Sequence, residues 1–328
     1  MRQIILLTTL ILLTLASLVF SLLSGSIDTS VDALLTVLSG NGNELLTQIV
    51  LELRWPRTAA AFTTGASLAI AGALMQVLLR NPLADPYVLG VSGGAATGAL
   101  LTLLLGLGGY WLPSAAFGGA LFSMLLVFGL SHGSGSWTTH RLLLTGIVIA
   151  AGWGAVIGFL LAISPDQNLR GMLFWLMGDL SHADSPTLAA GVLALGLVIA
   201  LAFSRSLNLL TRGELTAQTL GVSVTALRRT IYLLASILTA SAVTLAGSVG
   251  FVGLIVPHLL RLAGVRDHRL LLPAAVLLGG SLLVFADTLA RTVLAPHQLP
   301  VGILTALVGV PLFLALLYYS RELPGDRP

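Results

Sequence analysis

The chain has 328 residues, of which 56% are hydrophobic and only 9% are charged. This balance excludes a soluble globular protein, because too few charged side chains are available to cover a surface in water, and it indicates a protein embedded in lipid. The absence of cysteine excludes disulfides and thiolate metal sites, and the absence of lysine excludes a glycine-rich nucleotide-binding loop ending in Gly-Lys-Ser/Thr. The net charge of +3 fits arginines at a membrane surface better than nucleic-acid binding.

Ten apolar segments predict ten transmembrane helices, since about 20 apolar residues cross a bilayer. Residues 1–23 are expected to be the first helix rather than a signal peptide, because their apolar run exceeds the usual length of roughly 7–15 residues. Another apolar stretch, residues 171–180, is too short to cross and predicts a short helix near one membrane surface. The predicted spans are residues 4–23, 58–78, 88–107, 114–130, 142–163, 187–203, 230–248, 251–264, 271–293 and 301–319.

Arginine placement predicts the orientation of these spans. With the N-terminus inside, twelve arginines lie on the inner side and four on the outer side, which satisfies the positive-inside rule and makes both termini cytoplasmic. The outer four are Arg54, Arg57, Arg170 and Arg291, and they need a reason other than topology. Pro56, between the first two, suits the first turn of a helix. The inner arginines are Arg2, Arg80, Arg141, Arg205, Arg212, Arg228, Arg229, Arg261, Arg266, Arg269, Arg321 and Arg327.

Small residues recur at every fourth position of the fifth predicted span. Gly146, Ala150, Gly154 and Gly158 share one helix face, and small residues at this spacing let helices approach closely in lipid. The pattern indicates close helix packing. The alternative is that this face borders a pathway at a subunit interface.

The inner connection at residues 205–229 is polar and long for a membrane loop. Its glycines predict two short helices broken near Gly213 and Gly221. A simple connection would need far fewer residues. A docking element for a soluble partner explains the length better.

Groups that could carry out chemistry are sparse. The six histidines have no metal-ligand spacing, no serine lies in a nucleophile elbow, and no pair of carboxylates lies in mid-membrane. Asp287 comes nearest, but it precedes Arg291 by four residues, which predicts an i,i+4 ion pair. Breaks at residues 80–99, 247–269 and 298–313 favour a multi-helix transporter, since irregular backbone at membrane depth must be surrounded by protein or water.

Three long stretches resemble the signatures of the FecCD/BtuC-like permeases, the membrane subunits of bacterial ABC importers for haem, ferric siderophores and vitamin B12. They are RNPLADPYVLGVSGGA, GFVGLIVPHLLRLAGVRDHRLLLP and ADTLARTVLAPHQLPVGILTALVGVPLF, and the similarity runs from about residue 50 to 320. The resemblance implies one transmembrane permease domain over residues 1–328, in the inner membrane, that forms a homodimer with the pathway between its copies. It further implies two ATPase subunits, which bind ATP and Mg, and a periplasmic binding protein. No cofactor, metal or catalytic residue is expected on this chain.

The resemblance also implies roles for particular residues. Arg54, Arg57 and Arg291 match arginines that pair with glutamates of the binding protein, with contacts to lipid phosphate as the alternative. Glu214, Leu215, Ala217 and Gly221 match the coupling helices that sit in a groove of each ATPase.

The cargo follows less directly. DQNLR, at residues 166–170, is more similar to the haem-importing branch, so Arg170 is expected either to meet a haem propionate or to lie at lipid headgroups. Gly146, Gly154 and Gly158 are expected along the pathway. Haem is the predicted cargo, with a ferric siderophore and then vitamin B12 as alternatives. An ion-coupled secondary transporter and a membrane-embedded enzyme are the competing classes.

Overall fold

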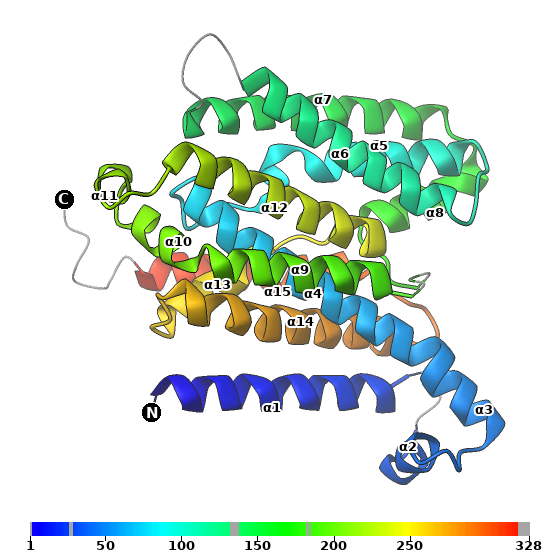
Figure 1. Ribbon diagram of the computed structural model, residues 1–328. Coiled ribbons are helices and arrows are strands. Elements are labelled where there is room, and N and C mark those ends of the chain that lie inside the picture. The colour runs from blue at the N-terminus through cyan, green and yellow to red at the C-terminus, as the bar shows by residue number, and fades with distance from the viewer. Residues whose placement is uncertain (1, 26–28, 132–137, 182, 184, 321–328) are drawn as a thin grey trace.

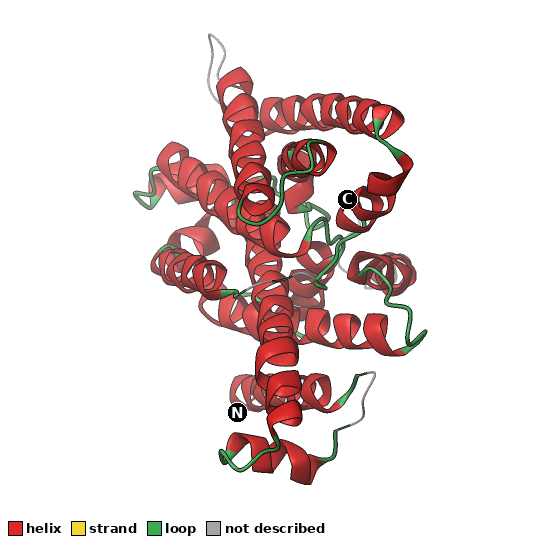
Figure 2. Cartoon of the chain, turned by 90° about the vertical axis from the view of Figure 1, so that its right-hand side faces the viewer, coloured by secondary structure: helices red, strands yellow, loops and turns green. Residues whose placement is uncertain are grey.

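The computed structural model describes residues 2–25, 29–131, 138–181, 183 and 185–320. Over these residues the chain forms helices and loops and no strand, as Figure 2 shows, and the predicted all-α fold is confirmed. Arg321, Arg327, His132 and His182 lie outside the described residues. The helices are α1 (Arg2–Leu23), α2 (Val31–Leu38), α3 (Glu44–Thr47), η1 (Gln48–Arg54), α4 (Trp55–Leu78), η2 (Pro86–Leu89), α5 (Val91–Leu104), α6 (Trp111–Ser131), α7 (Thr139–Ile163), α8 (Asp166–Leu176), α9 (Thr187–Ala202), α10 (Ser204–Thr211), α11 (Glu214–Thr219), α12 (Val224–Ala246), α13 (Val252–Leu262), α14 (His268–Thr292) and α15 (Val301–Ser320).

Each of the ten predicted spans coincides with a helix: α1, α4, α5, α6, α7, α9, α12, α13, α14 and α15. Within the described ranges, six helices are long and apolar enough to cross a membrane unaided, and α9 becomes a seventh if it is joined to α10 across a 60° bend. The remaining three, α5, α13 and α15, are shorter apolar helices. The short helix predicted near residues 171–180 is α8, which begins earlier, at Asp166.

The long helices run side by side between two ends of the molecule (Figure 1). The start of α1, the end of α15 and the short helices α10 and α11 lie at one end, here called the inner end. The helices α2, α3 and α8 lie toward the other, here called the outer end. The chain therefore returns to the end from which it started.

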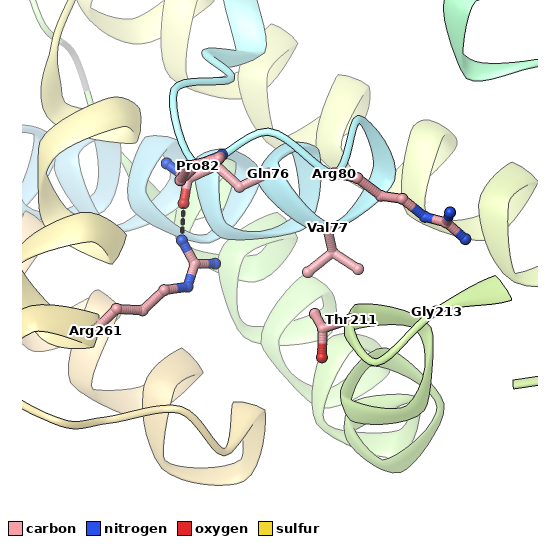
Figure 3. Close-up of a pocket in the computed structure, with 7 residues that line it drawn as sticks. All are labelled: Gln76, Val77, Arg80, Pro82, Thr211, Gly213 and Arg261. Atoms are coloured by element: carbon pink, nitrogen blue, oxygen red, sulfur yellow. Dashed lines mark hydrogen bonds between the residues drawn. The ribbon is translucent and has the colours of Figure 1, made fainter. Parts of the chain in front are cut away.

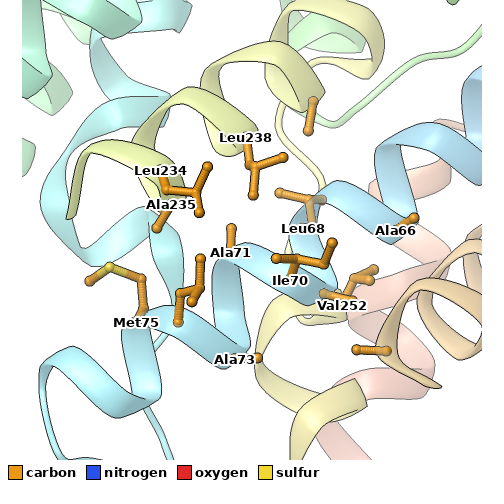
Figure 4. Packing of buried hydrophobic residues seen from close by; sticks show 14 of the residues in the cluster. Ala66, Leu68, Ile70, Ala71, Ala73, Met75, Leu234, Ala235, Leu238 and Val252 are labelled. Carbon is orange, nitrogen blue, oxygen red and sulfur yellow. The ribbon is translucent and has the colours of Figure 1, made fainter. Parts of the chain in front are cut away.

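The central helix is α4, which packs against α12, α13 and α14. Its apolar side chains lie in the largest core cluster together with Leu234, Leu238 and Val252 (Figure 4). Glycines let the backbones approach: a Cβ added to Gly72 would overlap the carbonyl oxygen of Gly253 on α13, and one added to Gly65 would overlap that of Gly279 on α14. These glycines thus allow α4 to pack closely against α13 and α14, as small residues commonly do between helices in lipid.

The eighth predicted span is the least regular. Its helix, α13, has 11 residues, which gives a length of about 16 Å, well short of a bilayer core of about 30 Å. The non-helical segment before it is enclosed by protein, since Gly247 packs against the carbonyl of Trp175 and the amide of Val249 donates to the hydroxyl of Tyr87 at 3.1 Å. Enclosure satisfies the condition under which irregular backbone persists at membrane depth.

Candidate docking, pathway and coupling sites

A buried charge cluster at the outer end is centred on Asp287. Arg57, in the first turn of α4, binds this carboxylate through Nε, at 3.1 and 3.0 Å from Oδ1 and Oδ2, and through Nη2, at 2.8 Å from Oδ1. Arg57 also donates from Nη1 to Oε1 of Gln298 at 2.7 Å. The two charged side chains are only 13% and 2% exposed, so the pair joins α4 to α14 with little access to water.

Arg291 belongs to the same cluster. Its Nε lies 3.8 Å from Oδ2 of Asp287, which confirms the predicted i,i+4 pair but makes it looser than the pair with Arg57. Its Nη2 donates to Oγ of Ser21 at 2.7 Å and so links α14 to α1. The stronger partner of Asp287, 230 positions away in the sequence, was not predicted.

Arg54 is buried where η1 meets α4. Its Nη1 donates to the carbonyl oxygen of Leu22 at 2.6 Å and to Oγ1 of Thr29 at 2.9 Å, which ties the end of α1 to this junction. Pro56 lies in the first turn of α4, as predicted. The wide π turn of η1 precedes it, however, so that helical backbone continues through the proline with the amide of Trp55 bonded to the carbonyl of Val50.

The three arginines expected to face a binding protein are therefore bonded within the chain itself. Arg54 and Arg291 are buried, and Arg57 is the most accessible of them. Arg57 and Arg291 lie against Asp287, and Arg54 is buried close to them, so this cluster of three guanidinium groups and one carboxylate carries a net positive charge of its own.

The small-residue face of α7 divides into two parts. Gly146 is buried, and a Cβ there would lie 2.8 Å from the carbonyl oxygen of Val88, so this glycine serves the predicted helix packing. Gly154 and Gly158 are exposed, and a Cβ on either would meet no atom within 4 Å. The buried residues of α7 are Leu142, Gly146 and Leu160, so most of this helix is not covered by the rest of the chain.

Arg170 lies on α8, directly after α7. Its guanidinium carbon is 5.5 Å from the ring centroid of Phe174, a cation–π arrangement, and its side chain is exposed. Asn168 donates to the carbonyl of Leu103 at 3.2 Å, and Met172 is fully buried against α5 and α7. These two anchors fix α8 so that Arg170 points away from the core.

The inner connection forms α10 and α11, which confirms the two short helices predicted there. Gly213 and Gly221 end and separate them with φ angles of 126° and 83°, which only glycine adopts easily. Ala217 is fully buried, so its part is to seat α11 against the core. The apolar side chains that α11 and the residue after it present to the outside are Leu215 and Leu220, 75% and 61% exposed.

Glu214 begins α11, and it is bonded within the protomer. Its Oε2 accepts from Nη2 of Arg80 at 3.3 Å and from Nη2 of Arg228 at 2.9 Å. Beside it, a cavity of about 240 Å³ separates the α10–α11 turn from α4 and is lined in part by Arg80, Thr211 and Arg261 (Figure 3).

The connection between α4 and η2 carries a perturbed carboxyl group. Oδ1 of Asp85 accepts from the amide of Tyr87 at 2.8 Å and caps η2. Burial raises the pKa of Asp85 to about 6, against the lowering effect of that hydrogen bond. Sequence reasoning had not singled out this residue.

Comparison with known proteins decides what these sites belong to. The model of the FecCD transport family matches residues 12–319. The chain belongs to this family. It is 43% identical to the hemin transport system permease HmuU of Yersinia pestis over 297 residues, 88% of each chain. It is 44% identical to the cobalamin import system permease BtuC of Halobacterium salinarum over 279 residues, 82% of this chain and 73% of that one.

A solved structure agrees with the same assignment. An inward-facing putative metal-chelate type ABC transporter superposes with a TM-score of 0.86 at 34% identity, over 95% of this chain and 98% of that one. The FecCD chain described here is therefore the membrane-embedded permease subunit of an ABC importer. The resemblance stated from its motifs is confirmed.

Proposed function

We propose that this permease moves haem into the cytoplasm of a bacterium, receiving it from a periplasmic binding protein and driven by ATP hydrolysis on two partner ATPase subunits. The observation that carries the cargo assignment is the exposed Arg170 over Phe174, on the helix that directly follows α7. Haem is a flat apolar ring with two carboxylates. An aromatic side chain and a planar guanidinium side by side match both parts of it.

The pathway in this proposal lies between two copies of the chain. Gly154 and Gly158 meet nothing within their own protomer, and α7 is largely uncovered. A second copy facing α7 would border a channel whose wall is smooth at these glycines. This placement supports the pathway alternative for Gly154 and Gly158, while Gly146 packs inside the protomer.

In this proposal the binding protein docks at the outer charge cluster. Arg54, Arg57 and Arg291 outnumber Asp287, and two copies of the chain would present the cluster twice, once to each lobe of a two-lobed partner. Because all three arginines have intramolecular partners, the cluster would act chiefly through its local net positive charge, which attracts acidic groups of a partner that comes close to it.

The ATPases dock at the inner end in this proposal. Leu215 and Leu220 are exposed apolar side chains on a polar surface, and a Cβ added to Gly221 would meet no atom of the chain within 4 Å. A groove on each ATPase would bury these leucines. ATP and Mg are then bound by the ATPase subunits and not by the permease. The permease lies in the inner membrane with both termini on the cytoplasmic side.

The test compares cargoes directly. A strain lacking this chain is grown with haem, a ferric siderophore or inorganic iron as the sole iron source, and with vitamin B12 where B12 is required. The proposal expects a defect confined to haem that the restored chain repairs. A defect confined to the siderophore or to B12 would replace haem with that cargo. Uptake by the purified chain in liposomes without ATPase subunits would instead favour an ion-coupled transporter.

A further inference from the structure

One carboxylate oxygen joins three elements at the inner end. Oε2 of Glu214, at the start of α11, accepts from Arg80, which follows the end of α4, and from Arg228, on the first turns of α12. The side chain of Arg228 is 12% exposed and that of Glu214 is 35% exposed, so this pair is partly shielded from water. Because both arginines bond the same oxygen, a displacement of α11 relative to the end of α4 or to α12 must stretch one of these two ion pairs or move the arginine with it.

The other end of the coupling segment is fixed separately. Asn208 on α10 donates from Nδ2 to Oδ1 of Asp267 at 2.7 Å and accepts from the amide of His268 at 3.0 Å, at the start of α14. Hydrogen bonds from the amide of Arg269 and from Asn208 hold the pKa of Asp267 below its usual range, so it stays ionised. The segment is thus anchored to α14 through α10 and to α4 and α12 through α11.

The backbone of Arg80 is held in an unfavourable conformation. Its φ is +48°, in the left-handed region that an arginine seldom adopts. Glycine or asparagine would fit this position with less strain. An arginine there is explained by the use of its side chain, which crosses to α11.

Beside Glu214, the link between α11 and the end of α4 is an ion pair, because a cavity of about 240 Å³ separates the turn at Thr211–Gly213 from the end of α4. The buried apolar contact of α11 with the core is made by Ala217. Figure 3 shows the side chain of Arg80 extending past this space. The same helix α4 begins at the outer end with Arg57 bonded to Asp287, so it connects the two charged ends of the molecule.

We propose that Glu214 is a positioning residue that passes the displacement of α11 to α4 and α12, and that it acts through Arg80 and Arg228 rather than by contacting the ATPase. The inference rests on the proposed ATP-driven import. In this role the carboxylate couples movement at the ATPase surface to the spans, while Leu215 and Leu220 make the contact with the ATPase.

The test uses the full transporter, with permease, ATPase and binding protein reconstituted in liposomes, and measures haem imported per ATP hydrolysed. Glu214→Gln, Arg80→Asn and Arg228→Gln should each lower this ratio about fivefold, the factor that corresponds to a partly exposed ion pair. Co-purification of the ATPase and the melting temperature should stay near wild type. Arg80→Asn suits the left-handed backbone, and Arg80→Lys, which keeps the charge, should recover part of the ratio. The matched control is Arg229→Gln, one position along α12 with an exposed side chain, which should leave the ratio unchanged.

Three results separate the possibilities. If Glu214 works through both arginines, Glu214→Gln combined with Arg80→Asn costs less than the sum of the two single losses. If Glu214→Gln alone releases the ATPase while Arg80→Asn and Arg228→Gln behave like the control, Glu214 contacts the ATPase directly and the inference is overturned. If the wild type imports a ferric siderophore or B12 in place of haem, the proposed cargo fails and the same ratio is measured with that cargo.

Discussion

At the residue scale, Asp287 is the least exposed charged group of the outer cluster, and its role is structural as well as electrostatic. Asp287→Asn keeps the shape of the side chain but leaves Arg57, 13% exposed, without a counter-charge. Removing one partner of a largely buried pair costs about 3–5 kcal/mol, and we expect a loss near the lower end, because Gln298 still accepts from Arg57. Thermal or denaturant unfolding of the purified chain in detergent measures it.

The matched variant for that prediction removes both charges. Arg57→Gln with Asp287→Asn removes both members of the closer ion pair, while Arg291, whose Nε lies 3.8 Å from Asp287, still loses its carboxylate, so the double variant should recover part of the stability lost in Asp287→Asn. Equal stabilities of the wild type and Asp287→Asn would show that the pair contributes nothing to the fold.

Asp85 gives a second prediction at this scale, in the pH dependence of stability. Its folded pKa of about 6 lies above the ordinary value for aspartate, so between these two values the folded state binds the proton more tightly. The contribution of this group is therefore fully present below the unfolded pKa and is lost as the pH rises through 6. Asp85→Asn keeps an oxygen for the amide of Tyr87 and removes the charge, so it should gain about 1–2 kcal/mol over the wild type at pH 8.

The measurement for Asp85 is the difference in melting temperature between the wild type and Asp85→Asn. Melting temperatures of wild type and Asp85→Asn, taken from pH 4.5 to pH 8, should diverge as the pH rises, because only the wild type must bury a carboxylate at high pH. Curves that stay parallel across this range would contradict the raised pKa.

At the element scale, α7 is the span with the least intramolecular cover. Gly158→Leu adds a side chain where a Cβ meets nothing within 4 Å, so the protomer should fold with an unchanged melting temperature. If a second copy faces α7, the added volume narrows the pathway or separates the copies, and ATP-driven uptake of the cargo should fall at least about tenfold, a size comparable to an overpacking cost of about 1–3 kcal/mol. Gly191→Leu on α9, also exposed and uncrowded, is the control and should leave uptake intact. Normal uptake by Gly158→Leu would place this face against lipid.

The elements also show what could be predicted from the sequence. The ten spans and the breaks at Gly213 and Gly221 rest on local signals, apolar runs and glycines, and the structure bears them out. The helices α2 and α3 were missed because they are short, although Ser30 and Asn43 cap them in the manner of sequence-readable N-caps. Arg57 with Asp287, and Glu214 with Arg80, could not be predicted, because pairs 230 and 134 positions apart depend on how the fold places α4 relative to α14 and α11.

At the scale of the whole molecule, the net positive charge of the cluster formed by Arg54, Arg57, Arg291 and Asp287 gives the last prediction. If the binding protein is steered by this field, its association rate constant with the permease–ATPase complex should fall as ionic strength rises, since the Debye length shrinks from about 10 Å at 0.1 M salt to about 3 Å at 1 M. Arg57→Gln lowers the net charge of the cluster by one and should weaken the salt dependence. The double variant Arg57→Gln with Asp287→Asn removes one charge of each sign and should keep it. An association rate insensitive to salt, or a double variant as impaired as the single one, would mean that net charge does not guide docking. If the double variant is as impaired as Arg57→Gln alone, Arg57 itself bonds to the binding protein and exchanges its ion pair with Asp287 for that contact.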